Sequence, residues 1–174
     1  LYYLCNPISK MKFKIVKLER FSGNKAGIYS VALNNDEETL LNKFVRENEI
    51  SFKSEIKNIL ERIRTINEKT GARENFFKPN EGKPGDLVCA LFDIPNSNLR
   101  LYCIRFGNSL IILGGGGEKK KTIKAFQEVD KLKEENYILR EISAQIAERI
   151  KEKDITFSYD GTEITGELEF ENNE

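Results

Sequence analysis

Three apolar runs follow one another in the middle of the chain, with only short turn-rich segments between them. They are DLVCALF, LRLYCIRF and SLIIL, separated by DIPNSN and by Gly107-Asn108. A two-residue connection that contains glycine and asparagine joins neighbouring antiparallel strands. We therefore expect a three-stranded antiparallel meander, and the rest of the chain must pack around it.

The expected turn also sets a register between the last two strands of the meander. With Gly107-Asn108 as a two-residue turn, Tyr102 faces Leu113 and Arg100 faces Gly115. This register puts the side chain of Arg100 beside a run of glycines.

Helical patterns lie on both sides of the meander. Asp36 is suited to cap a first helix, and Gly71 is suited to end a second one that begins near Ser51. A third pattern starts at Thr122, with an interruption expected near Asn136. The apolar stripes that define the second and third helices are Phe52, Ile56, Ile59, Leu60, Ile63 and Ile66, and then Leu139, Ile142, Ile146 and Ile150.

Alternating runs at the two ends of the chain predict β-hairpins. MKFKIVKLE and GIYSVALN form the first pair, and the runs on either side of Asp160-Gly161 form the second. The whole pattern predicts an α+β fold, with an antiparallel sheet packed against helices. We assign residues 11–152 to the main domain and 153–174 to an acidic C-terminal hairpin extension. Met11 is the only methionine, which leaves residues 1–10 as either an upstream segment or the natural amino terminus.

Composition excludes several kinds of site. The 28 Lys and Arg balance 28 Asp and Glu, so the chain lacks the overall positive charge of a protein that binds nucleic acid by non-specific charge attraction. It has no histidine, which excludes a His-dependent catalytic triad or zinc site. The odd number of cysteines without a C-x-x-C pair predicts reduced, buried thiols and a cytoplasmic protein. No apolar run has the length of a membrane span.

The stretch LGGGGEKKKT, from Leu113 to Thr122, sets four glycines beside three lysines. Its spacing matches neither a Walker-type phosphate loop nor a dinucleotide-binding loop, so we expect no nucleotide cofactor. Two interpretations of the glycines remain. They let the backbone leave the strand and enter a helix, or they let a large group approach the backbone closely.

The expected register gathers positive charge at this corner. Arg100 and the lysines at 119, 120 and 121 collect at one end of the sheet, with Tyr102 one pleat along the same face. Fixed cations of this kind stabilise the extra negative charge of a phosphodiester transition state. The alternatives are ordinary solvated lysines and a tyrosine that packs in the core.

The order of a helical pair, a meander and the segment LRLYCIRFGNSLIILGGGGEKK resembles the RelE/ParE/HigB superfamily of bacterial type II toxins. The resemblance covers residues 51–124 and implies a RelE-like fold. Members like RelE and HigB cleave mRNA on the ribosome without a metal or other cofactor, whereas members like ParE target gyrase. The resemblance also implies a cognate antitoxin as a partner, besides the ribosome and mRNA.

The family's site residues carry over as follows. Arg100 matches the strand arginine that contacts the scissile phosphate, and Lys119 or Lys120 replaces the basic residue after the last strand, so these three are the expected catalytic residues. The expected substrate-binding residues are Lys78, Lys83, Tyr102 and Lys121. The neutral charge, the added hairpins and the lack of histidine depart from the family pattern. They favour a second interpretation, a non-enzymatic protein-binding module on a toxin-like scaffold, and a ParE-like gyrase inhibitor is a third.

The acidic C-terminal segment supports one more hypothesis. From Asp160 to Glu174 the chain has acids and no Lys or Arg. Either this segment folds across the basic corner and masks it, or it is a charged edge hairpin that resists aggregation.

Overall fold

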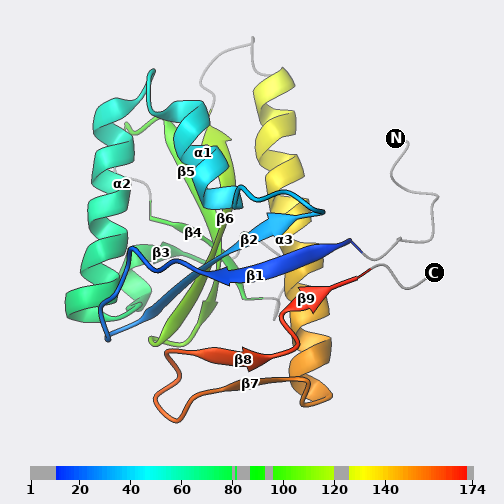
Figure 1. Cartoon of the computed structure of the whole chain (residues 1–174). Coiled ribbons are helices and arrows are strands. Elements are labelled where there is room, and N and C mark those ends of the chain that lie inside the picture. Colours follow the sequence, from blue (N-terminus) through cyan, green and yellow to red (C-terminus); the bar gives the residue numbers. More distant parts are fainter. Residues whose placement is uncertain (1–10, 80, 82–86, 93–95, 120–125, 172–174) are drawn as a thin grey trace.

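A seven-stranded sheet forms the centre of the computed structural model, which describes residues 11–79, 81, 87–92, 96–119 and 126–171. The strand order is β3-β4-β5-β6-β2-β1-β9 (Figure 1). Strands β2 and β6 pair in parallel, and the other neighbouring strands of this sheet pair antiparallel. The chain therefore has an α+β fold with a mostly antiparallel sheet.

The elements have the following bounds. The strands of the sheet are β1 (Phe13–Lys17), β2 (Gly27–Leu33), β3 (Phe77–Lys78), β4 (Val88–Leu91), β5 (Leu99–Phe106), β6 (Leu110–Glu118) and β9 (Glu169–Phe170). Strands β7 (Ile155–Phe157) and β8 (Ile164–Gly166) form a separate two-stranded sheet. The α-helices are α1 (Leu40–Asn48), α2 (Lys53–Thr65) and α3 (Phe126–Lys151).

The predicted meander of β4, β5 and β6 is confirmed, but its predicted register is wrong. Phe106 pairs with Leu110, so the turn has three residues rather than two, and Gly107 in it has a φ of 57°. A bulge between Leu101 and Cys103 shifts the pairing by one more residue. Arg100 therefore faces Gly117 and not Gly115.

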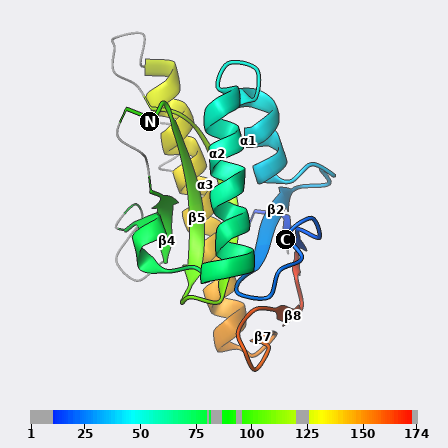
Figure 2. The same ribbon diagram turned by 90° about the vertical axis from the view of Figure 1, so that its left-hand side faces the viewer.

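Two apolar layers cover the two faces of the sheet. Figure 1 shows α2 and α3 on opposite sides of the sheet, and Figure 2 looks onto the α2 side. Ile56, Ile59, Ile63 and Ile66 pack with β5 and β6 in the first layer, and Leu139, Ile142 and Ile146 pack in the second. The apolar stripes that predicted these two helices are thus confirmed as core.

The first helix begins later than predicted. Thr39, not Asp36, caps α1, and its hydroxyl accepts a hydrogen bond from the Asn42 N–H at 3.2 Å. The Asp36 carboxylate accepts instead from the Glu38 N–H at 3.1 Å, in the turn before the helix. The second helix continues through a π-helical turn, Ile66–Thr70, and ends at Gly71 with a φ of 74°, as its glycine predicted.

The predicted interruption near Asn136 is also wrong. Helix α3 runs over 26 residues without a break. A single asparagine costs a helix about 0.5 kcal/mol relative to alanine. The free energy gained by burying Leu139, Ile142 and Ile146 exceeds this cost. Among the helices within the described ranges, none is long and apolar enough to cross a membrane.

The glycines after Leu113 stay in the strand. Strand β6 continues through them to Glu118, and none of Gly114 to Gly117 has a positive φ, so the expectation that they let the chain leave the strand is wrong. A methyl group on Gly114 would come within 2.9 Å of the Leu139 side chain, and one on Gly116 would overlap with the main chain of Arg100. The glycines therefore provide room for the close approach of α3 and of β5.

The described part of the acidic C-terminal segment ends in β9, which forms the edge of the sheet opposite to β3. Strand β9 pairs with β1, and ion pairs join Lys12 to Glu171 at 3.1 Å and Lys17 to Glu163 at 2.8 Å. The predicted second strand of the C-terminal hairpin is thus divided between β8 and β9. The hypothesis that this segment folds across the basic corner and masks Arg100 is wrong, because Glu163, Glu169 and Glu171 pair instead with the lysines at 17, 14 and 12.

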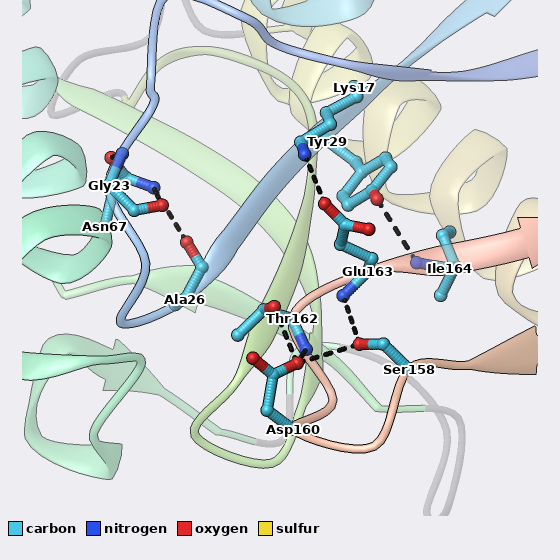
Figure 3. A network of polar contacts seen from close by, with 10 residues as sticks. All are labelled: Lys17, Gly23, Ala26, Tyr29, Asn67, Ser158, Asp160, Thr162, Glu163 and Ile164. Carbon is cyan, nitrogen blue, oxygen red and sulfur yellow. Dashed lines mark hydrogen bonds and ion pairs between the residues drawn. The ribbon is translucent and has the colours of Figure 1, made fainter.

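The turn between β7 and β8 is held against the main sheet by polar contacts (Figure 3). The Tyr29 hydroxyl accepts a hydrogen bond from the Ile164 N–H at 3.2 Å. Inside the turn, the Asp160 carboxylate accepts from the Thr162 N–H at 3.1 Å and from the Thr162 and Ser158 hydroxyls, both at 2.8 Å, and these bonds lower the pKa of Asp160.

Candidate functional site

Arg100 lies near the amino-terminal end of β5, away from the turn to β6, where β5 pairs with the glycine part of β6. Lys78 in β3 faces Ala90, and Ala90 in turn faces Tyr102. Directly paired residues of neighbouring strands have side chains on the same face, and so do residues two apart in one strand. Lys78, Tyr102 and Arg100 therefore share the face of the sheet that α3 covers.

A carboxylate that the sequence did not single out joins two of the predicted cations. The Lys78 Nζ atom lies 3.8 Å from Glu81 Oε1, and the Arg100 Nη1 atom lies 3.9 Å from Glu81 Oε2. The Arg100 side chain is 19% exposed and the Glu81 side chain 16% exposed. We call Lys78, Glu81 and Arg100 the mixed-charge site.

Helix α3 holds the main chain of Glu81 in place. The Asn136 side-chain amide donates a hydrogen bond to the Glu81 carbonyl oxygen at 2.7 Å. Asn136 had been expected to interrupt the helix, and nothing in its spacing marks it as a contact of residue 81. Such a contact depends on the packing of α3 across the sheet, which the sequence pattern does not define.

Tyr102 contributes mainly to packing. It is 5% exposed and belongs to the apolar layer between the sheet and α3, together with Ile104 and Leu139. The structure supports the interpretation of Tyr102 as a residue that packs in the core. Little of its ring is left to stack on a base.

Lys119 contacts the segment that leads into β5. Its N–H donates to the Asn98 carbonyl oxygen at 2.6 Å, which extends the pairing of β5 with β6 by one residue. Its Nζ atom donates to the Ser97 hydroxyl at 3.0 Å. Ser97 lines an open cavity of about 360 Å³ between α2 and residues 96–99. The other predicted residues Lys83, Lys120 and Lys121 lie outside the described residues.

A second charged cluster lies where α1 and α3 meet β6. The Lys131 Nζ atom is 2.9 Å from Glu47 Oε2 and 3.3 Å from Glu135 Oε1. The Glu135 side chain is only 7% exposed, and this burial raises the pKa of its carboxyl group although Lys131 opposes the shift. The i,i+4 spacing of Lys131 and Glu135 predicts a surface ion pair, so only the fold reveals the burial.

Two cysteine thiols lie in the core. Cys89 and Cys103 are free and buried on paired positions of β4 and β5, with their Sγ atoms 3.4 Å apart. The hydrogen bond with Cys89 and burial raise the pKa of Cys103 well above its ordinary value. Since the thiolate is the reactive form, Cys103 is a poor nucleophile. Within the part of the chain that the structure covers, no group of three or more Cys, Asp or Glu is placed to hold a metal ion.

Comparison with protein-family models gave no match, and the searches of curated proteins and of solved structures gave none either. The function proposed below therefore rests on the residues of the mixed-charge site and on the arrangement of the strands and helices around it.

Proposed function

We propose that this chain is a toxin-like component of a type II toxin–antitoxin system and a metal-independent, ribosome-associated mRNA endoribonuclease. The observation that carries the proposal is the guanidinium of the mostly buried Arg100 side chain, which shares one carboxylate with Lys78 on the α3 face of the sheet. A guanidinium and an ammonium that converge on one anion form a site of the kind that binds a phosphate group.

The RelE-like fold is part of the proposal. It is supported by the order of the elements, in which the helical pair α1 and α2 precedes the meander of β4, β5 and β6, and α3 follows it. In such a toxin the partners are the ribosome and mRNA, and a cognate antitoxin that restrains the activity.

The proposed reaction is attack by an RNA 2′-hydroxyl on the adjacent phosphate. The 2′-oxygen forms a bond to phosphorus and loses its proton to solvent. The bond from phosphorus to the 5′-oxygen of the next nucleotide breaks, and this oxygen takes up a proton, so the products are a 2′,3′-cyclic phosphate and a 5′-hydroxyl. Arg100 stabilises the additional negative charge on the phosphate oxygens as this charge develops. Lys78 adds a second positive charge, and Lys119 and Lys120 are the further cations that the family resemblance assigns to this step.

The test is growth inhibition together with translation-coupled mRNA cleavage, in the absence of any antitoxin. We expect Arg100→Ala to abolish both. Arg46→Ala is the matched control, because Arg46 is also paired with a glutamate, Glu38 at 2.8 Å, but lies on α1. If Arg100→Ala inhibits growth and cleaves mRNA as the unchanged protein does, the proposal is wrong.

A second candidate is a non-enzymatic protein-binding module on the same scaffold. It is favoured by Glu81, which neutralises positive charge at the mixed-charge site, and by the zero net charge of the chain. Antitoxin binding without mRNA cleavage in the assay above would support it. Inhibition of gyrase supercoiling without mRNA cleavage would instead support a ParE-like function.

A further inference from the structure

The carboxylate of Glu81 lies between two cations that the proposed function assigns to RNA. Its distances to Lys78 Nζ and Arg100 Nη1 are 3.8 Å and 3.9 Å. Hydrogen bonds between charged nitrogen and oxygen atoms are about 2.7–2.9 Å long. Charge attraction alone therefore holds the carboxylate near these two atoms, without the short directional contacts of a bidentate pair.

The main chain of Glu81 is held more firmly than its carboxylate. The Asn136 amide donates to the Glu81 carbonyl oxygen at 2.7 Å, which is a full hydrogen bond. This bond holds the carbonyl group of Glu81 and not the carboxylate, which lies at the other end of the side chain. Helix α3 thus presents a carboxylate to the two cations and does not fix it there.

We propose that Glu81 is a built-in counter-ion that occupies the phosphate position of the mixed-charge site, and that a phosphodiester of the RNA displaces it. This inference rests on the proposed function for the identity of the ligand. A phosphodiester and a carboxylate each carry one negative charge, so the exchange leaves the charge of the site unchanged. The phosphate gains short contacts with the guanidinium that the carboxylate lacks.

Competition by Glu81 also sets the affinity of the site. A carboxylate that stays within about 4 Å of the phosphate repels it, and one that moves away must give up its attraction to both cations. In either case the wild-type protein binds an anion more weakly than the two cations alone would. Removal of the Glu81 charge is therefore expected to increase phosphate affinity.

The experiment measures the binding of inorganic phosphate by isothermal titration calorimetry at constant ionic strength. We expect Glu81→Gln, which keeps the size of the side chain, to bind phosphate about tenfold more tightly than the wild type. Glu163→Gln is the matched control, because it makes the same change in net charge at an ion pair with Lys17, at 2.8 Å, on the β1 side of the molecule. We expect the gain to disappear in the double variant Glu81→Gln/Arg100→Ala.

A second variant tests the same inference without changing any charge. Asn136→Ala releases the main chain that presents Glu81, and we expect it also to bind phosphate more tightly than the wild type. Equal phosphate affinities of the wild type, Glu81→Gln and Asn136→Ala would overturn the inference. So would a gain in Glu81→Gln that Glu163→Gln matches.

This readout needs no ribosome, so the inference and the proposed function fail separately. Tighter phosphate binding by Glu81→Gln, with no mRNA cleavage by any variant, would support the counter-ion and overturn the endoribonuclease. Cleavage that depends on Arg100, with a phosphate affinity that Glu81→Gln leaves unchanged, would overturn the counter-ion and support the endoribonuclease.

Discussion

The carboxylate of Glu135 in α3 lies directly over the main chain of Gly115 in β6, where a methyl group would overlap with the Oε2 atom. This oxygen is buried and has no hydrogen-bond partner among the residues that the structure describes. The contact explains why glycine is needed at position 115, because the backbone there has no positive φ. The contact also buries the carboxylate of Glu135 between α3 and β6, and burial of this charge costs free energy of folding.

The first prediction concerns Gly115. We expect Gly115→Ala to lower the free energy of unfolding by about 1–3 kcal/mol, because the new methyl group must displace a buried carboxylate. The measurement is urea denaturation followed by circular dichroism. In Gly115→Ala/Glu135→Ala the overlap is absent, so the double variant should lose less stability than the sum of the two single variants.

Gly117→Ala is the matched control for this prediction. A methyl group on Gly117 would lie 3.2 Å from Lys131 Cγ, which belongs to a flexible, partly exposed side chain that can shift. Alanine also restricts the unfolded chain more than glycine does, so we expect a net change within about 0.5 kcal/mol. Equal losses from Gly115→Ala and Gly117→Ala would show that Glu135 does not determine the need for glycine.

The second prediction concerns the pH dependence of stability. Burial raises the pKa of Glu135 in the folded protein, so the folded state binds this proton more readily than the unfolded state. The stability that the proton contributes is present below the unfolded pKa, about 4.5, and is lost as the pH rises through the folded pKa. We expect Glu135→Gln to be more stable than the wild type at pH 7. We also expect its stability not to fall as the pH rises through the folded pKa of Glu135.

Lys131 retains a partner in Glu135→Gln, because its Nζ atom lies 2.9 Å from Glu47. The control is Glu134→Gln, at the exposed neighbouring position of α3. Unfolding midpoints measured between pH 4 and pH 8 give the comparison. A Glu135→Gln protein that is less stable than the wild type at pH 7 would mean that the contact with Lys131 outweighs the cost of burial.

The sequence was sufficient to predict the elements whose pattern depends on local periodicity. The apolar stripe from Ile56 to Ile66 predicts a helix, because a period of 3.6 residues places all its members on one face, and this helix is present. The meander was predicted for a similar reason. Its register was predicted wrongly, because a bulge next to Tyr102 and the choice between a two- and a three-residue turn leave no periodic signal.

The candidate site was predictable only in part. Arg100 was singled out by the expected register and the family resemblance, and Lys78 by the resemblance alone. Pairing through β4 places both on one face of the sheet. Glu81 and Asn136 were missed, because their contacts join a loop to a helix that is 55 residues away along the chain. The partner of a charged residue depends on tertiary packing, which single-sequence patterns do not contain.

The third prediction concerns Asn67, which is fully buried in the π-helical turn after α2. Its amide nitrogen donates to the Gly23 and Ala26 carbonyl oxygens at 3.1 Å and 2.9 Å, and its Oδ1 atom accepts from the Gly23 N–H at 2.7 Å. Figure 3 shows how it bridges the segment that leads into β2. We expect Asn67→Ala to lower the free energy of unfolding by about 2–3 kcal/mol, because it leaves these backbone groups buried without partners.

Urea denaturation tests this prediction, with Asn75→Ala at an exposed position as the control. Asn67→Asp is a useful third variant, because it keeps the acceptor for Gly23 but removes both donated hydrogen bonds and buries a charge. We expect it to be as destabilised as Asn67→Ala. A loss of less than about 0.5 kcal/mol in Asn67→Ala, the range of surface substitutions, would mean that the segment rearranges to satisfy its own backbone.

The fourth prediction concerns Arg149, which holds β9 against the sheet. Its Nη1 atom donates to the Glu167 and Glu169 carbonyl oxygens, both at 2.6 Å, and its guanidinium lies 3.6 Å from the centre of the Phe170 ring. Lysine keeps the charge but has neither the fork of donors nor a planar group to stack. We expect Arg149→Lys to lower the free energy of unfolding by about 1–2 kcal/mol.

Hydrogen exchange distinguishes a local effect from a global one. The Ile15 N–H donates to the Leu168 carbonyl oxygen at 2.9 Å, so its exchange reports on the attachment of the segment that leads into β9. In Arg149→Lys we expect faster exchange at Ile15 than in the control Arg140→Lys, where the guanidinium lies over the exposed ring of Tyr137. The rings of Phe13 and Phe170 are stacked with their centres 4.1 Å apart, which is a second attachment of β9 to β1. Unchanged exchange at Ile15 would mean that this stacked pair holds β9 in place without Arg149.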